Sequence, residues 1–438
     1  MKRFVRPGAF LLLAALLFCL SGCYSGNIDQ YFSLPMASEE YRQLQSLIDE
    51  ELASGSEYAA PIHGSYRQSV QLSDVDGDGA DEALAFFRDA AKNPKINIYD
   101  SENGEHRLAL SISGEGSSIG RIDYADLTGD GQKELLVSWQ ISSGLSVLGV
   151  YSLAGWSSDV LLSTDSAEFV TGDINRDGCD ELLNLRAANS TTYLVDQYTF
   201  PLGQEPQATS AALSAGISAL QRLRMVTLAG DAPALLAEST LTTGDLVSDL
   251  FVCRDGSLIN LTMNRTTQIS ETRRSYSLVY AQDIDGDGST EIPHPQQLYS
   301  RGDEVFWSIA WFRYDASGRA STIMTTYHCV TDNWYLVLPS GWDVGLTVRR
   351  DDSVSGERAV ILSRLRSDGS LEDYVAIYAI TGENRYERAR LDNRFLLQEE
   401  GTTVYAAKIL DGKTDENTIR SRFHVIYTDW SSGSVVGG

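Results

Sequence analysis

Cysteine and histidine are scarce in this chain of 438 residues, which contains five of each. Beyond residue 23 the cysteines are Cys179, Cys253 and Cys329, which are far apart and odd in number. No CxxC pair and no Cys/His cluster occurs, so the pattern does not indicate a zinc site. One disulfide outside the cell is an alternative whose pairing the sequence cannot choose. We favour three small buried side chains.

Positive charge is also in short supply. The chain has 35 lysines and arginines against 60 aspartates and glutamates, and its formal net charge is −25. Without the first 22 residues, which hold three basic residues and no acidic ones, the net charge is −28. Such a surface repels phosphates, which argues against binding to DNA or RNA.

Signatures of catalysis are missing as well. The sequence contains no phosphate-binding P-loop and no H-E-x-x-H. His328 near Asp332 could act as a base and its orienting partner, but we prefer a packed or surface histidine. Paired carboxylates for glycoside chemistry cannot be singled out among 60 acidic residues. The five histidines stand in unrelated contexts: His63, His106, His294, His328 and His424.

Long apolar runs are limited to one, at the N-terminus. Lys2, Arg3 and Arg6 precede the apolar segment 10–20, and Leu-Ser-Gly-Cys follows and ends at Cys23. This order is typical of a secretory signal over residues 1–22. Its end resembles the bacterial lipobox, in which Cys23 is lipidated; an ordinary signal peptide with a chance cysteine is the alternative. We therefore expect an extracytoplasmic protein that is lipid-anchored to a bacterial membrane and does not cross it.

A tether and a short helix are expected next, within residues 23–57. Tyr41, Leu44, Ile48 and Leu52 share one face of a helix predicted over 37–52. Ser38 can cap its N-terminus, and Gly55 follows its C-terminus.

Against these absences stands a nine-residue motif that occurs four times, at 74–82, 126–134, 173–181 and 283–291. Each copy has oxygen side chains at positions 1, 3, 5 and 9 and glycine at position 6. This spacing suits a hard cation such as calcium, which takes six to eight oxygen ligands, and glycine permits the sharp turn. A solvated acidic turn without an ion is the alternative.

Short strands are predicted around these loops, so each loop joins two strands of a hairpin. The strands before the loops are predicted at 69–72, 119–124, 168–170 and 276–280. The strands after three of them are predicted at 83–87, 135–139 and 182–185. Two further strands, exemplified by 146–151 and 159–162, complete four strands per unit.

The loops recur about every 50 residues, except that the last gap is about twice as long. A degenerate copy lies within that gap, at 227–236, where most carboxylates are replaced. Five four-stranded units of this length predict an all-β fold, a β-propeller.

The loop followed at once by an apolar strand resembles the FG-GAP or VCBS repeat, over about residues 66–292. The whole layout also resembles VCBS-repeat lipoproteins of Clostridia-type bacteria. The resemblance implies a propeller over 58–328 whose structural calcium ions stiffen hairpins on one face, with side-chain ligands at positions 1, 3, 5 and 9 and a backbone carbonyl at position 7. These residues are Asp74, Asp76, Asp78, Ala80 and Glu82; Asp126, Thr128, Asp130, Gln132 and Glu134; Asp173, Asn175, Asp177, Cys179 and Glu181; and Asp283, Asp285, Asp287, Ser289 and Glu291.

Two features qualify this interpretation. Thr128 weakens the second site because a hydroxyl replaces a carboxylate. An EF-hand would need glutamate at position 12 and flanking helices. That position holds Ala85, Val137, Asn184 and His294, so we set the EF-hand aside.

After about residue 325 the repeat pattern blurs. Further strands are predicted at 334–339, 345–348, 358–365, 374–380, 403–409 and 424–427. They form either remaining blades, for five to seven in total, or a separate β-rich domain over 329–438, which we favour.

Aromatic residues crowd the region 307–342, where they could stack on sugars or bind a protein partner. We favour a buried core, because Trp307, Ile309 and Trp311 alternate at strand period.

Anchorage, repeats and missing catalytic motifs together predict a non-catalytic binding or scaffold protein of the cell surface, with an envelope protein or polysaccharide as partner. The alternatives are an enzyme acting on polysaccharide, a lyase or hydrolase, and a calcium or envelope sensor.

Overall fold

The computed structural model describes residues 39–102, 105–300 and 302–426, and the chain in this range is all-β. The expected signal peptide, Cys23, the tether and the first two residues of the expected helix lie outside the described residues. The helix itself is confirmed as α2 (Glu39–Ala53). No helix among the described residues is long and apolar enough to cross a bilayer.

The first four sheets are antiparallel, and each is formed by consecutive segments of the chain. The first contains β1 (Glu57–Tyr58), β2 (Val70–Ser73), β3 (Glu82–Arg88), β4 (Pro94–Glu102) and β5 (Glu105–Ser113). The second contains β6 (Ser118–Ala125), β7 (Glu134–Ser142), β8 (Leu145–Ser152) and β9 (Asp159–Ser166). The third contains β10 (Glu168–Gly172), β11 (Glu181–Ala187), β12 (Tyr193–Thr199) and β13 (Gln207–Ala212). The fourth contains β14 (Ile217–Leu228), β15 (Ala232–Leu241), β16 (Leu246–Arg254) and β17 (Ser257–Asn260).

Two five-stranded sheets follow. The fifth sheet has the order β20-β21-β22-β23-β29 and the sixth has the order β24-β25-β26-β28-β27. The strands of the fifth are β20 (Glu291–Gln297), β21 (Trp307–Tyr314), β22 (Ala320–Cys329), β23 (Trp334–Val337) and β29 (Phe423–Val425). Those of the sixth are β24 (Leu346–Asp351), β25 (Glu357–Leu365), β26 (Leu371–Ile380), β27 (Phe395–Glu400) and β28 (Thr403–Ile409). The smaller elements are β18 (Met263–Asn264), β19 (Ile269–Ser270), α3 (Arg385–Arg388), α4 (Glu416–Arg420), η2 (Ala154–Trp156), η3 (Val330–Asp332) and η4 (Leu391–Asn393).

Each sheet packs its face against the next sheet. Because successive side chains of a strand point to opposite faces, one strand contributes to the cores on both sides of its sheet. Leu135 and Val137 of β7 belong to the core shared with the first sheet, whereas Leu136 belongs to the core shared with the third. The same holds for β11, where Leu182 faces the second sheet and Leu183 the fourth. Strands buried on both faces need continuous apolar runs, which is the pattern found directly after the acidic loops.

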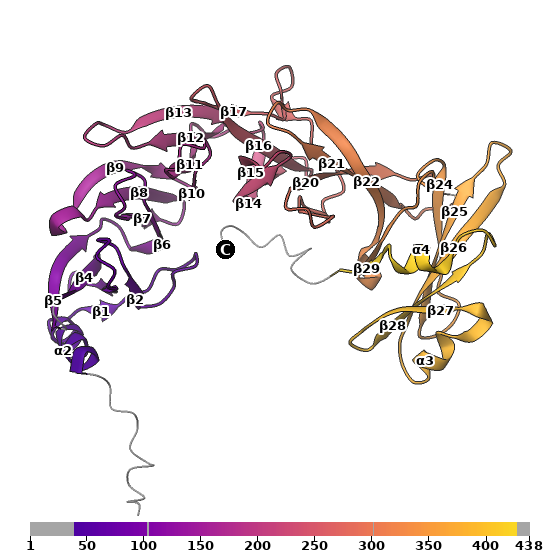
Figure 1. Cartoon of the computed structure of the whole chain (residues 1–438), viewed down its shortest axis with the longest axis horizontal. Helices are drawn as coiled ribbons and strands as arrows, with labels where there is room; N and C mark the ends of the chain where they lie inside the picture. Colours follow the sequence, from indigo (N-terminus) through magenta and orange to yellow (C-terminus); the bar gives the residue numbers. More distant parts are fainter. Residues whose placement is uncertain (1–38, 103–104, 301, 427–438) are drawn as a thin grey trace, which may run out of the picture.

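The sheets follow one another along an arc, from the first sheet beside α2 to the sixth sheet with β27, β28 and α3 (Figure 1). The two ends of the arc lie apart in this view. A polar contact also joins neighbouring sheets. Arg121 on β6 is buried, and its guanidinium donates to the Glu168 carboxylate at 2.6 Å and to the carbonyl of Phe169 at 2.8 Å, both on β10.

The structure corrects two expectations about the second half of the chain. The predicted strand 276–280 is irregular, and isolated bridges flank it, one between Arg274 and Leu246 and one between Gln282 and Glu291. The boundary expected at residue 328 falls inside the fifth sheet, because β23 pairs with β22 and β29 pairs with β23. The fifth and sixth sheets also share one core, which contains Trp334 and Val375.

Candidate metal-binding loops

Three of the four acidic loops join two paired strands of one sheet: β2 to β3, β6 to β7 and β10 to β11. The fourth loop precedes β20. The degenerate copy forms the tight turn between β14 and β15, where Gly230 and Asp231 both have a positive φ. The loops therefore occupy equivalent places in successive sheets.

All four loops are organised by the aspartate at position 1. One carboxylate oxygen of Asp74 accepts from the amide of Gly77 at 2.8 Å, and the other accepts from the amide of Gly79 at 3.2 Å. The corresponding bonds in the other loops are made by Asp126, Asp173 and Asp283. This aspartate holds the turn at positions 4 and 6, where the backbone has a positive φ, as at Gly77 and Gly79. In the third loop position 4 is Arg176, which has a positive φ although it is not glycine.

The glutamate at position 9 closes each loop from the first residue of the following strand. Its Oε2 accepts from the amide at position 2, as in Glu82 to Val75 at 2.9 Å. Glu134, Glu181 and Glu291 make the same contact. The four glutamates are fully buried or nearly so. The loops differ in the partner of the other glutamate oxygen, Oε1.

In the first loop, Glu82 Oε1 has no hydrogen-bond partner among the described residues. Burial raises the pKa of this carboxyl to about 7. Potential ligand atoms of Asp74, Asp76 and Asp78 lie within 4.8 Å of one another, and so do those of Asp76, Glu82 and Asp100. A buried carboxylate oxygen without a donor, aimed among other carboxylates, is the arrangement that a cation stabilises.

In the second and third loops a neutral side chain at position 3 satisfies the glutamate. Thr128 Oγ1 donates to Glu134 Oε1 at 3.3 Å, and Asn175 Nδ2 donates to Glu181 Oε1. Burial raises the pKa of Glu181 to about 7 and also raises that of Glu134. These loops have fewer carboxylates than the first, so we expect them to bind a cation more weakly.

In the fourth loop a protein cation is already present. The guanidinium of Arg313, on β21, contacts Asp285 at 2.7 Å, Asp287 at 2.8 Å and Glu291 at 2.8 Å. It therefore occupies three of the oxygens that the sequence assigned to a metal ion. Neither Arg313 nor Asp100 was among the residues predicted from the motif.

Neighbouring loops touch, so they form a row along the stacked sheets. The amide of Lys133 in the second loop donates to the carbonyl of Val75 in the first at 3.3 Å. Gly129 lies against the thiol of Cys179 in the third loop, and Arg176 donates to the carbonyl of Asp231 in the degenerate turn. The amide of Thr290 in the fourth loop donates to the carbonyl of Thr227 at 2.8 Å. A loop that is held in one conformation therefore restrains the neighbouring loop through these contacts.

Most of the aromatic region is core, as favoured from the sequence, but Trp307, Phe312 and Tyr335 are only partly buried. Trp311 and Trp334 are fully buried, and Trp342 and Tyr314 nearly so. His328 and Asp332 do not form a base and its orienting partner. His328 Nε2 contacts Thr326 Oγ1 at 2.8 Å, whereas the Asp332 carboxylate is bound by Arg358 and the thiol of Cys329. Cys179, Cys253 and Cys329 are all free thiols, and only Cys329 is fully buried.

Burial of His328 predicts a loss of stability in acid. Burial lowers the pKa of His328 to about 3, so the unfolded chain binds a proton near pH 6.5 that the folded chain does not. Folding stability is therefore complete above pH 6.5 and falls as the pH decreases, by about 2 kcal/mol at pH 5. Thermal melts of the wild type and of His328→Gln at pH 7.5 and pH 5 measure this term. We expect a smaller acid shift in the variant, and equal shifts would contradict the assignment.

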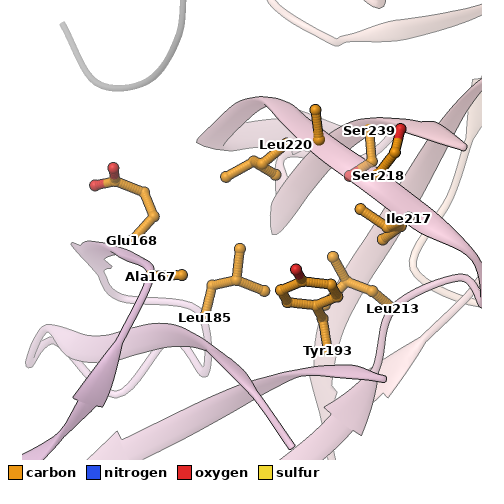
Figure 2. Close-up of a pocket in the computed structure, with 10 residues that line it drawn as sticks. Ala167, Glu168, Leu185, Tyr193, Leu213, Ile217, Ser218, Leu220 and Ser239 are labelled. Atoms are coloured by element: carbon orange, nitrogen blue, oxygen red, sulfur yellow. The ribbon is translucent and has the colours of Figure 1, made fainter. Parts of the chain in front are cut away.

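A cavity of about 330 Å³ lies between the third and fourth sheets (Figure 2). Its walls are mainly apolar and include Leu185, Leu213 and Ile217. Two of the polar side chains at its edge are committed elsewhere, since Glu168 is bound by Arg121 and Ser218 donates to a backbone carbonyl, whereas Ser239 Oγ has no hydrogen-bond partner among the described residues. This cavity does not bring together groups that could perform catalysis.

Comparisons with known proteins leave the family open. No family model matches the chain, and no curated protein matches it. Among solved structures, a protein described as a 6-phosphogluconolactonase from Bacteroides uniformis is similar over 68% of this chain and 82% of its own, with 12% identity and a TM-score of 0.26. A similarity of this size supports no statement about activity.

Proposed function

We propose that this protein is a non-catalytic binding or scaffold protein, held outside the cell at a bacterial membrane by lipid on Cys23. We infer that its sheets are the blades of an FG-GAP-type propeller and that calcium at the acidic loops stiffens them. An envelope protein or polysaccharide would then bind the rigid face or its loops.

The observation that supports this proposal best is the first loop. Two groups of three carboxylates share Asp76 there, one with Asp74 and Asp78 and the other with Glu82 and Asp100, and the buried Glu82 Oε1 has no donor among the described residues. Oxygen-only ligands of this number suit calcium. Because the loops touch one another, a cation in one of them also restrains its neighbours.

Equilibrium dialysis with calcium tests the metal part of the proposal. We expect the wild type to bind at least one calcium ion per chain with a dissociation constant on the order of 10 µM. Asp76→Asn should lose this site because it removes a charge from the centre of the first loop. Glu205→Gln is the matched control, since Glu205 is an exposed acid outside all four loops. Equal binding by both variants would contradict the assignment.

Anchorage and the lack of catalysis are tested separately in the producing cells. The wild type should partition into the detergent phase and incorporate labelled fatty acid, and Cys23→Ser should do neither. Purified protein should release no reducing ends from envelope polysaccharide. Release that depends on a carboxylate outside the loops would overturn the non-catalytic function in favour of a hydrolase or lyase.

A further inference from the structure

The four loops differ at one position outside the motif, which lies opposite the motif glutamate on the next strand along the chain. Ala83 pairs with Tyr99, so Asp100 stands opposite Glu82. In the same way Leu135 pairs with Tyr151 and Leu182 with Tyr198, and Glu291 pairs directly with Arg313. The residues opposite the four glutamates are Asp100, Ser152, Thr199 and Arg313. Their charges are negative, neutral, neutral and positive.

Asp100 is placed to act as a ligand in the first loop. It is buried, and its carboxylate lies within 4.8 Å of those of Asp76 and Glu82. Asp100 Oδ2 accepts from the exposed Arg107 at 2.9 and 3.2 Å, and one arginine does not balance the charges of Asp100 and of the four motif carboxylates. Glu82 Oε1 remains without a donor in the described part of the chain. The cluster therefore keeps a net negative charge, which a bound cation would neutralise.

Arg313 has the opposite effect in the fourth loop. Its guanidinium donates to Glu291 Oε1, the oxygen that corresponds to the unpartnered oxygen of Glu82. It also contacts the carboxylates at positions 3 and 5, Asp285 and Asp287. Charge-assisted contacts of this kind are strong, and an incoming ion would have to displace all three.

We propose that Asp100 is an extra ligand which makes the first loop the tightest calcium site, and that Arg313 is a built-in cation which leaves the fourth loop independent of metal. This inference rests on the proposed function, in which the loops bind calcium. The first loop then offers five carboxylates and the carbonyl of Ala80. A set of six or more oxygens, with room for bidentate carboxylates, favours calcium over the smaller magnesium ion.

The test counts bound calcium and measures its affinity in the full chain, by equilibrium dialysis and chelator competition. Asp100→Asn should weaken the tightest site about tenfold or more, because the charge of the ligand set tunes affinity. Ser152→Asp should strengthen the second site, because it places the same ligand opposite Glu134. Glu205→Gln should change neither value. An unchanged tightest site in Asp100→Asn would overturn the first half of the proposal.

Two variants test the fourth loop, one that should gain a calcium ion and one that should not lose any. Arg313→Gln should bind one calcium ion more per chain than the wild type, whereas Asp285→Asn in the wild-type background should remove none. An Arg313→Gln protein that folds but gains no ion, or an Asp285→Asn protein that loses one, would overturn the second half. If Arg313→Gln does not fold, as judged by circular dichroism, the Asp285→Asn count decides alone.

The same measurements separate this inference from the proposed function. A wild-type protein that binds no calcium at about 1 mM would remove calcium from the proposed function and this inference with it. A wild type that binds calcium, with an affinity that Asp100→Asn does not alter, would leave the proposed function standing and overturn only the role of Asp100.

Discussion

In about 1 mM calcium the protein is expected to unfold at a midpoint on the order of 10 °C higher than in chelator. A site with a dissociation constant of about 10 µM contributes about 2.7 kcal/mol at this concentration. Two occupied loops, at roughly 2 °C per kcal/mol for a chain of this size, give a shift of that order. The physical source is the repulsion among buried and crowded carboxylates, above all around Glu82, which a cation reverses.

Differential scanning calorimetry of the wild type and of two variants measures this shift. Asp76→Asn should lose at least half of it, because the first loop is the tightest of the sites. Asp285→Asn should keep all of it, because Arg313 already neutralises the fourth loop. No shift in the wild type would remove calcium from the mechanism, and the loops would then be acidic turns held by their own hydrogen bonds.

The positions of the loops and of most strands could be predicted because the signals are local. The aspartate at position 1 bonds to amides three and five residues further on, so the motif and its turn are encoded in one short segment. The apolar run after each loop follows from burial on both faces of the central strand. The degenerate turn at Gly230 was found for the same reason, since the strands on both sides keep their pattern although the carboxylates are gone.

The residues opposite the motif glutamates were missed because they depend on strand register. Asp100, Ser152 and Thr199 each follow their glutamate by 18 positions. In the fourth unit a longer connection between β20 and β21 moves Arg313 to 22 positions after Glu291. Aligning the units at a fixed offset would have revealed Asp100, but it would have placed Ile309 where Arg313 stands. Register across a hairpin changes with the length of the turn, which a motif does not contain.

The irregular segment 271–282 was predicted in part as a strand because Tyr276, Val279 and Tyr280 have high strand propensity. In the structure these side chains pack by other means. Tyr276 lies against Trp307, with ring centroids 5.5 Å apart, and the ring of Tyr280 lies under the guanidinium of Arg222. These residues are of the types that favour strands because strands are half-buried, and here they are buried without forming a strand.

A buried ion network holds this segment on the fourth sheet, and its loss is the second large effect we expect. Glu238, on β15, is fully buried and accepts from Arg274 at 2.9 Å, from Ser248 at 2.8 Å and from the amide of Ala281 at 3.1 Å. Arg222 adds a second guanidinium at 3.8 Å. Glu238→Gln keeps the shape but leaves the buried Arg274 and the partly buried Arg222 without this counter-charge. We expect a loss of about 3–5 kcal/mol.

Amide hydrogen exchange of β15 and β16 measures this loss locally, because the segment and the fourth sheet open together. Glu372→Gln is the matched control, since Glu372, on β26, pairs with the exposed Arg366 and Lys413 and should change stability little. The double replacement of Glu238 and Arg274 by methionine should cost less than Glu238→Gln alone, because no unpaired charge remains at that contact. If the single and double variants were equally destabilised, the cost would come from packing in the fourth sheet, and the segment would be held by its aromatic side chains rather than by charge.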